Sequence, residues 1–438
     1  MITITAEYLN QNWNILQTNS ILPTPLSEWD NGDAYTLASL GQFPSSKTVF
    51  AAIVLGDKKL SDFQFIIRLH KLENDTPQSY RAPTGDIYEA VAEAIVDGNS
   101  KKIEIKIVSL MIDLSCRRKK LIEADLLKDV TVFIVGLGTG GIQVALDLAK
   151  SGIGKFNLMD PDRLEVGNIS RHYAGISLVG RTKVKAARDL ILDKNPMAEV
   201  ETYVMSAEPD QREVLRELIE KSSLVICATD NRQSKLLLNA LCVTLRKTII
   251  FGGAFQRAYG GQVFRVLPGV SPCYHCFVLA VPGKESDMEI SSQRNADAIA
   301  YSDMPVAVEP GLSIDVSPIA NLISKLAVME LIKGKDSTLH ILDEDFTAPW
   351  YLWVNRPEPN TEYATIQRLS ESGVEGKDGM TILRWYAIHL KKELACPTCG
   401  DFEGALRKQY GLVEGDKPSL LSLRLPNQES EREINNGT

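Results

Sequence analysis

Three glycines, Gly136, Gly138 and Gly141, follow an apolar, β-branched run at 132–135 and lead into apolar residues at helical spacing. This order predicts a strand, a phosphate-binding loop and a helix. We expect Gly136 to form the tight turn, Gly138 to let backbone amides approach a phosphate, and Gly141 to let the helix pack on its strand. The helix N-terminus would add free N–H groups and the positive end of a dipole. The chemistry predicted for this loop is therefore the binding of nucleotide phosphates.

An acidic residue, Asp160, follows the next predicted strand, Lys155–Met159. It stands where a carboxylate can hydrogen-bond a ribose, and on these features alone NAD would be the default ligand. Further polar residues favour ATP, because cations offset the charge of phosphates and an aspartate can hold Mg²⁺. In chain order they are Asp162, Asn168, Arg171, Lys183, Asp230 and Asn231.

Each of these polar residues also has a purely structural explanation. The aspartates could simply follow strands, the cations could be surface charges, and the asparagines could cap loops. Against this, Gly136, Asp160 and Asp230 all fall directly after predicted strands. Ligands of parallel sheets bind at the carboxyl ends of the strands, so the sequence predicts a single site there.

Four of the seven cysteines form two Cys-x-x-Cys pairs. Each short loop presents two thiolates, so the two pairs together predict a closed, tetrahedral Zn²⁺ site with a structural role. A redox dithiol is the alternative, and we expect His275 to be a loop residue and not a ligand. The predicted ligands are Cys273, Cys276, Cys396 and Cys399.

The composition predicts a globular, cytoplasmic protein. A chain of 438 residues with 44% hydrophobic and 24% charged residues has room for two or three domains. The net charge of −8 and the pI near 5.4 make nucleic acid an unlikely partner. The first residues lack a signal-peptide pattern and no apolar stretch is long enough for a bilayer, so we expect no membrane contact.

Strands and helices alternate over residues 131–255, which predicts an α/β fold with a doubly wound, mostly parallel sheet. A helix at 116–128 would enter this domain. A later helix at 318–334 would pack an apolar stripe into the core. The alternating elements are strands near Glu199–Val204, 223–229 and 248–253, and helices at Gln211–Lys221 and Arg232–Leu245. The stripe is Ile319, Leu322, Ile323, Leu326, Met329 and Leu331.

The remaining segments complete the predicted domain organisation. Residues 1–110 are expected to form an α+β domain with a recognition or scaffold role, or merely a structural cap. Residues 111–340 would form the nucleotide domain, 341–424 a segment that completes the zinc site, and 425–438 a disordered tail. Within the first domain, the expected elements are strands at 47–56, 62–69 and 102–110 and a helix at 87–96.

Together these residues resemble the ThiF/MoeB/E1 superfamily, and within it the bacterial ThiF-type E1-like proteins of ubiquitin-like conjugation operons. The resemblance covers about residues 110–335 and the cysteines near 396. It includes an NLxRQ-like segment ending in His172 in place of glutamine, and a GxxK pattern ending at Lys183. It implies a Rossmann-like domain that uses Mg-ATP to adenylate the C-terminal carboxylate of a ubiquitin-like protein, releasing pyrophosphate.

The resemblance also implies individual roles. Asp160 would bind the ribose, Arg171 and Lys183 the phosphates, and Asp230 the Mg²⁺. In a homodimer, Arg117 or Arg118 would reach the partner's ATP, although a solvated basic patch is the alternative explanation. Residues 277–312 correspond to the crossover loop over which the tail of the ubiquitin-like protein, ending in glycine, would thread.

No cysteine lies in residues 277–335, where relatives that form a thioester usually carry theirs. Cys227 and Cys242 are expected to be core residues, and Cys116 borders two arginines. We therefore expect transfer to a separate E2-like carrier or a sulfur acceptor, with no thioester on this chain. Two other functions stay open: adenylation of a peptide or a tRNA nucleoside, and an inactive, nucleotide-binding dimerisation platform.

Overall fold

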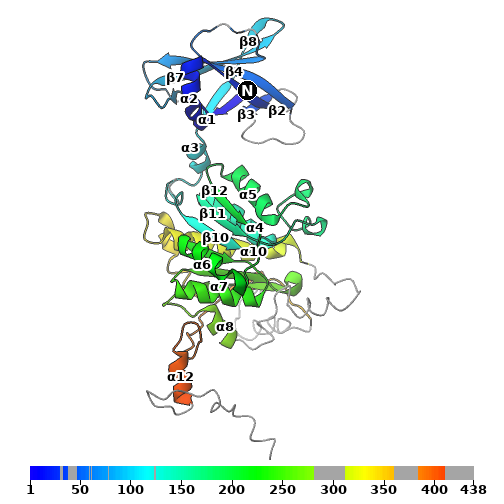
Figure 1. Cartoon of the computed structure of the whole chain (residues 1–438), viewed down its shortest axis with the longest axis vertical. Helices are drawn as coiled ribbons and strands as arrows, with labels where there is room; N and C mark the ends of the chain where they lie inside the picture. The colour runs from blue at the N-terminus through cyan, green and yellow to red at the C-terminus, as the bar shows by residue number, and fades with distance from the viewer. Residues whose placement is uncertain are drawn as a thin grey trace, which may run out of the picture.

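The computed structural model describes residues 1–29, 33–37, 47–58, 60, 62–76, 78–122, 125–280, 311–359 and 383–409. Figure 1 shows a β-rich N-terminal unit at one end, followed by helix α3 (Leu110–Ser115) and a larger α/β unit. The expected tail at 425–438 and most of the stretch at 277–312 lie outside the described residues.

The N-terminal unit is a single nine-stranded sheet around an apolar core. Strands β8 and β9 are separated only by Glu104; β8 pairs with β7, while β9 pairs with β1 at the other end of the sheet, so the sheet closes on itself. Helices α1 (Ala6–Gln11) and α2 (Trp13–Asn19) add Leu9, Trp13 and Leu16 to the core. The strands are β1 (Ile2–Thr5), β2 (Ile21–Trp29), β3 (Ala34–Leu37), β4 (Lys47–Leu55), β5 (Phe65–Leu72), β6 (Tyr80–Arg81), β7 (Ile87–Val96), β8 (Asn99–Ile103) and β9 (Ile105–Val108).

The predicted helix at 87–96 is wrong, because this segment is strand β7. Its alanines and glutamates favour a helix locally, but β7 pairs with β5 over eight residues and with β8 from Ala92 to Val96. Cross-strand pairing outweighs intrinsic propensity here. The unit is accordingly β-rich, with two short helices against one sheet, and the strands predicted near 47–56, 62–69 and 102–110 are present as β4, β5 and the β8–β9 pair.

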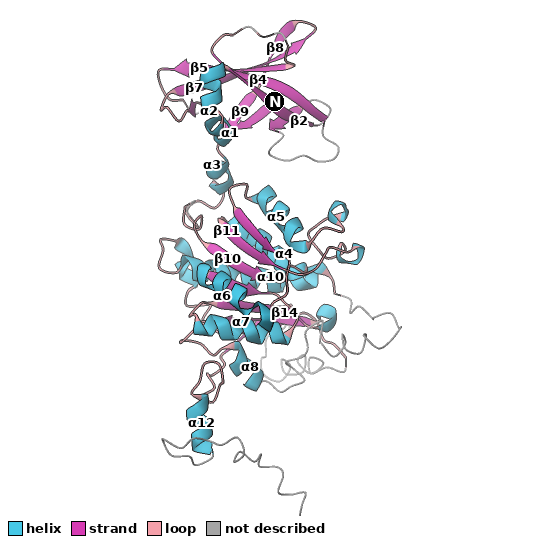
Figure 2. Ribbon diagram, viewed as in Figure 1, coloured by secondary structure: helices cyan, strands magenta, loops and turns pink. Residues whose placement is uncertain are grey.

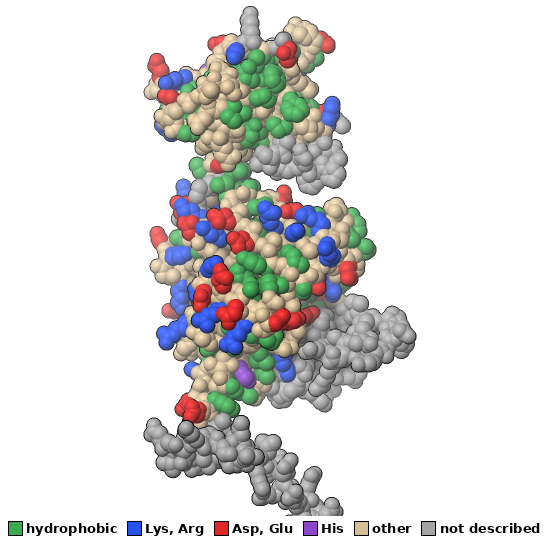
Figure 3. Space-filling model, in the orientation of Figure 1, with side chains coloured by type: hydrophobic (Ala, Val, Ile, Leu, Met, Phe, Trp, Pro, Cys, Tyr) green, Lys and Arg blue, Asp and Glu red, His purple; other side chains and the backbone are tan. Residues whose placement is uncertain are grey.

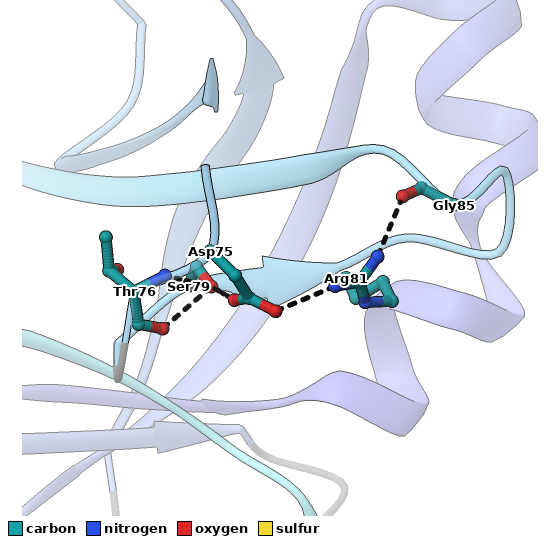
Figure 4. Close-up of polar contacts among 5 residues, drawn as sticks. All are labelled: Asp75, Thr76, Ser79, Arg81 and Gly85. Atoms are coloured by element: carbon teal, nitrogen blue, oxygen red, sulfur yellow. Dashed lines mark hydrogen bonds and ion pairs between the residues drawn. The ribbon is translucent and has the colours of Figure 1, made fainter. Parts of the chain in front are cut away.

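A polar network closes the loop between β5 and β7 (Figure 4). The Asp75 carboxylate accepts hydrogen bonds from the Ser79 hydroxyl and from the Arg81 guanidinium, the latter at 2.7 Å. Arg81 also donates to the Gly85 carbonyl at 3.3 Å, so one side chain ties both parts of the loop together. These groups are exposed, and we assign them a structural role in the loop.

The α/β unit is built on an eight-stranded sheet in the order β12-β11-β10-β13-β14-β15-β16-β17. The first five are parallel and the last three antiparallel. The chain runs outward from β10 through β11 to β12 and then crosses to β13, which creates a topological switch point beside β10. The strands are β10 (Thr131–Val135), β11 (Lys155–Met159), β12 (Glu199–Tyr203), β13 (Leu224–Cys227), β14 (Ile249–Ala254), β15 (Gly260–Val266), β16 (Trp350–Val354) and β17 (Arg384–Ile388).

Helices cover both faces of this sheet (Figure 2), which confirms the predicted doubly wound fold. One core packs α4 (Thr139–Ser151), α5 (Lys183–Lys194) and α10 (Ser313–Ile332) on the sheet, and the other packs α6 (Arg212–Lys221), α7 (Arg232–Thr244) and α8 (Tyr274–Ala280). The predicted apolar stripe of α10 lies in the first core. A short helix, α12 (Phe402–Gln409), follows the last cysteine pair.

The predicted helix at 116–128 is absent from the described residues of that segment, which form turns after α3. Lys120 has a left-handed backbone with a φ of 76°, which an α-helix cannot contain.

On the face shown in Figure 3, acidic and basic side chains are mixed over the α/β unit, and the basic ones do not form one continuous surface. Among the described residues, no helix is both long and apolar enough to cross a membrane.

Candidate nucleotide-binding site and cysteine centre

The carboxyl ends of the parallel strands border a cavity of about 440 Å³. It lies at the topological switch point beside β10, at the strand ends where the sequence predicts a single site, and it brings together the glycine loop after β10 and the acidic residues after β11 and β13. The polar candidates that line it are Asp160, Asp162, Asn168, Arg171, Lys183, Asp230 and Asn231. Residues from distant parts of the chain therefore form one site.

The geometry of the loop explains its glycines. Gly136 has a φ of +90°, and a Cβ there would lie 2.8 Å from the Ala228 backbone. A Cβ on Gly141 would lie 2.0 Å from the Gly136 carbonyl oxygen, so only glycine lets α4 pack this closely on the loop. Gly138 differs, because a Cβ there would meet no atom within 4 Å and would project into open space beside the cavity. The first two glycines are needed by the fold, while Gly138 leaves room for a ligand.

Asp160 is 5% exposed at the end of β11. Its Oδ2 accepts a hydrogen bond from the Leu137 amide at 2.6 Å, and its Oδ1 accepts one from the Asp162 amide at 2.9 Å. Burial raises the pKa of this carboxyl group, whereas the nearby Lys183 ammonium lowers it. Each carboxylate oxygen keeps a further lone pair, so the group can hold the glycine loop and still accept a ribose hydroxyl.

Two cations line the cavity, Arg171 from the segment between β11 and α5 and Lys183 from the start of α5. Lys183, the first residue of α5, donates to Asp162 at 2.7 Å, with side-chain exposures of 13% and 59% respectively. Arg171 is half-buried and lies one residue before His172. Both cations can face an anionic ligand in the cavity, where partial desolvation strengthens their effect.

Asp230 lines the cavity as an exposed residue after β13. The two asparagines have clear structural roles. Asn231 is the N-cap of α7 and accepts from the amides of Gln233 and Ser234, and Asn168 accepts from the Glu165 amide at 3.0 Å within a capping box. These contacts agree with the alternative explanation that the two asparagines cap loops.

The sequence reasoning missed polar residues on two other walls of the cavity. Ser206 and Glu208 follow β12, and Ser234 lies in the first turn of α7. Ser206 and Glu208 can also be predicted from the sequence, because they follow the strand expected near Glu199–Val204, and the carboxyl end of that strand must lie at the same edge of the sheet.

The two upstream arginines lie away from the cavity of their own chain. Arg118 donates to the Lys150 carbonyl at 3.1 Å and packs against Gly152 at the C-terminus of α4. This is the end opposite the glycine loop, about 20 Å away along a 13-residue helix. Burial lowers the pKa of Arg118. Arg117 is exposed.

The four predicted zinc ligands lie together, with all sulfurs within 4.8 Å of one another. Sγ of Cys273 is 3.9 Å from that of Cys276 and 3.6 Å from that of Cys396, and Sγ of Cys276 is 3.4 Å from that of Cys399. A tetrahedral Zn²⁺ with Zn–S bonds of about 2.3 Å needs sulfurs about 3.8 Å apart. The donor set and spacing fit Zn²⁺. His275 instead contacts the Thr398 hydroxyl at 3.0 Å, consistent with a loop role.

A buried amide that the sequence did not reveal supports the cysteine centre. Asn239 on α7 is fully buried, and its Oδ1 accepts from the Tyr274 amide at 2.9 Å. Its amide nitrogen is buried without a hydrogen-bond partner among the described residues, and it is close enough to the Cys273 thiol to lower the pKa of that group. An amide donor in this position can orient and tune a metal ligand.

Two of the other three cysteines are core residues, as the sequence predicts. Cys227 and Cys242 are buried in the core beside α7, and burial raises the pKa of the Cys242 thiol well above its usual value. Cys116 is exposed after α3.

A family model and curated proteins match parts of this chain. Residues 118–367, more than half of the chain, match the ThiF family. The chain is 34% identical over 163 residues to the adenylyltransferase and sulfurtransferase UBA4 of Lodderomyces elongisporus, a match that covers 36% of this chain and 34% of the relative. It is 29% identical over 162 residues to the ubiquitin-like modifier-activating enzyme 5 of Caenorhabditis elegans, covering 35% and 39%. The chain thus spans about a third of the length of these curated relatives.

Solved structures similar to this chain include PaaA, with 25% identity, a TM-score of 0.43 and coverage of 52% of this chain and 71% of that one. The Escherichia coli MccB structure with ATP has 18% identity, a TM-score of 0.44 and coverage of 63% and 68%.

Proposed function

Because the chain belongs to the ThiF family, we propose that it is an E1-like adenylyltransferase that uses Mg-ATP to activate a C-terminal carboxylate. The observation that carries this proposal is the convergence, in one cavity, of the glycine loop with Asp160, Arg171, Lys183 and Asp230. A hydride-transfer enzyme would have little use for these cations and the second acid. Adenylation requires charge to be offset on the phosphates, and this residue set can do so.

The chain's own residues would divide the binding of ATP among them. The amides at the N-terminus of α4 face the phosphates, and Asp160 accepts a ribose hydroxyl. Arg171 and Lys183 offset the phosphate charge, which for Lys183 requires release from, or sharing with, Asp162. Asp230 would hold Mg²⁺, which when bound adds positive charge beside the phosphates.

In the proposed reaction, a carboxylate oxygen of the substrate attacks the α-phosphorus of ATP. The bond between the α-phosphorus and the bridging oxygen breaks, and pyrophosphate leaves with that electron pair, so that an acyl-adenylate remains. A C-terminal carboxylate has a pKa of about 3.5 and is ionised at neutral pH. The reaction therefore needs no general base, and the chain acts by holding the reactants in place and by offsetting charge.

For the substrate we propose a ubiquitin-like protein ending in glycine, as encoded by bacterial conjugation operons. We further propose that the adenylate passes to an external carrier or sulfur acceptor. The burial of Cys227 and Cys242 supports this second step, because neither thiol can meet a bulky tail without unfolding of the core. A neighbouring small open reading frame ending in glycine would identify the partner to test.

We also propose a homodimer in which Arg117 reaches the partner's nucleotide. Arg118 is the weaker candidate, since it already binds the C-terminus of its own α4. Light scattering should show a dimer. Arg117→Ala should then lower nucleotide turnover in that dimer, whereas a fully active monomer would contradict the proposal.

Product analysis tests the reaction itself. ATP, Mg²⁺ and the partner protein should yield pyrophosphate and the acyl-adenylate, which releases AMP only when an acceptor nucleophile displaces it, with no ADP or inorganic phosphate, because the α-phosphorus is the one attacked. ADP as the main product would contradict adenylation.

Zinc is proposed to be structural, so chelation should reduce stability before it affects product identity.

A further inference from the structure

His172 makes two hydrogen bonds that fix its protonation. The residue is 8% exposed, its Nε2 lies 3.0 Å from the Leu137 carbonyl oxygen, and its Nδ1 lies 3.0 Å from the Ala174 amide nitrogen. A backbone amide can only donate, so Nδ1 must be the unprotonated acceptor. The proton is therefore on Nε2, which donates to the Leu137 carbonyl.

The backbone amide and the backbone carbonyl of Leu137 are each held by a hydrogen bond to a side chain from another segment. Asp160 accepts from the Leu137 amide at 2.6 Å, and His172 donates to the Leu137 carbonyl. Leu137 stands between Gly136 and Gly138, whose lack of a side chain gives the backbone wide conformational freedom. Two buried polar groups from a different segment thus restrict a loop that would otherwise adopt several conformations.

We propose that His172 is a positioning residue, whose neutral ring holds the loop at 136–138 in the conformation that receives the nucleotide phosphates. This inference rests on the proposed nucleotide site. His172 need not touch the nucleotide to do this. It acts through the Leu137 carbonyl, and the bond from Ala174 keeps its ring in the required tautomer.

The surroundings oppose protonation of this ring. Burial lowers the pKa of His172; the Lys183 ammonium at the start of α5 lowers it further, while the Leu137 carbonyl and the Asp160 carboxylate raise it. Asp162 pairs with Lys183 on the same side, and Arg171 is the preceding residue. A second proton would have to sit on Nδ1, directly against the Ala174 amide, so protonation would break the arrangement.

The test measures ATP affinity by calorimetry with the full chain, between about pH 7.5 and about pH 5.5, a range that brackets the usual titration of histidine. His172→Gln can keep both hydrogen bonds, since its amide donates and its carbonyl accepts, yet it does not titrate. His172→Phe keeps the ring volume and loses both bonds. His340→Gln removes a histidine that lies in a distant segment and pairs with Asp343, and it serves as the matched control.

At about pH 7.5, His172→Gln should bind ATP within about twofold of the wild type, and His172→Phe about tenfold more weakly. As the pH falls, the wild type and His340→Gln should lose more affinity than His172→Gln does. Titration of ATP itself is common to all variants, so this difference reports on His172.

Two outcomes would overturn the inference: unchanged ATP affinity in a folded His172→Phe variant, or a pH dependence in His172→Gln equal to that of the wild type. The second holds even if His172→Phe fails to fold. A wild-type chain that binds no ATP at any pH would instead overturn the proposed nucleotide site itself, and the inference with it.

Discussion

The Asp160 carboxylate accepts a hydrogen bond from the Leu137 backbone amide at 2.6 Å, so the predicted ribose acid also anchors the glycine loop. Asp160→Asn should weaken both roles. An asparagine side chain has only one oxygen, so its NH₂ group would face one of the two backbone N–H donors, from Leu137 or Asp162. We expect a loss of about 1–3 kcal/mol in the free energy of unfolding and at least tenfold weaker ATP binding. Thermal melts and calorimetry would check this. Wild-type values for both would show that neither role is real.

Gly138 and Gly141 provide a matched pair of substitutions. Gly141→Ala would place a Cβ 2.0 Å from the Gly136 oxygen, and we expect a loss of about 3 kcal/mol in the free energy of unfolding. Gly138→Ala meets no atom within 4 Å, so the fold should keep its stability to within about 0.5 kcal/mol. The added methyl group should nevertheless weaken ATP binding about tenfold or more. Equal ATP affinity in Gly138→Ala would argue that phosphates do not approach this residue.

The burial of His172 predicts how stability changes with pH. Its folded-state pKa is lowered below the usual 6.5, so the unfolded state binds protons more readily as the pH falls below about 6.5. Stability should therefore decline on acidification, by at most about 1.4 kcal/mol per pH unit down to the folded-state pKa. Melting temperatures of the wild type and His172→Gln, recorded between about pH 7.5 and about pH 5.5, should diverge, with the variant less sensitive. Parallel curves would contradict the prediction.

Asn239 allows the cysteine centre to be tested without removing a ligand. Asn239→Asp keeps the acceptor for the Tyr274 amide but replaces the donor beside Cys273 with a carboxylate. We expect zinc to be released about 10–100-fold faster to a colorimetric chelator. Asn195→Asp is the control, because it removes a similar amide donor, 3.0 Å from the Ile153 carbonyl, at a distant position. Identical release from both variants, or well under one zinc per wild-type chain, would count against the centre.

The structural features that can be predicted from the sequence depend on residues that lie close together in the chain. The strand, glycine loop and helix at 131–151 lie within one continuous segment, and the turn requirement of Gly136 is local. Each cysteine pair also lies within one short segment, so each segment contributes two metal ligands. Strand ends of a parallel sheet meet at one edge, so the sequence alone predicts that Asp160 and Asp230 share a site, and both line the same cavity.

The features that the sequence does not predict depend on contacts between distant segments. The strand at Ile87–Val96 has the composition of a helix and is set by its pairing with β5 and β8. His172 reaches a carbonyl 35 residues away, and Asn239 reaches an amide 35 residues away. No local periodicity reveals such bonds, because they arise only when the sheet brings the segments together.

Pyrophosphate exchange into ATP, measured with the partner protein present for the wild type and for Asp230→Ala, tests whether the chain adenylates a carboxylate. Adenylation is reversible before the adenylate is passed on, so the wild type should incorporate labelled pyrophosphate into ATP only when the carboxylate substrate is present. Asp230 is exposed, so its truncation should leave the fold intact. We predict partner-dependent exchange by the wild type and a loss of at least about 100-fold in Asp230→Ala, as expected when charge stabilisation at the phosphates is removed. Exchange at the wild-type rate in a folded Asp230→Ala variant, or exchange by the wild type that is independent of any carboxylate partner, would contradict the account.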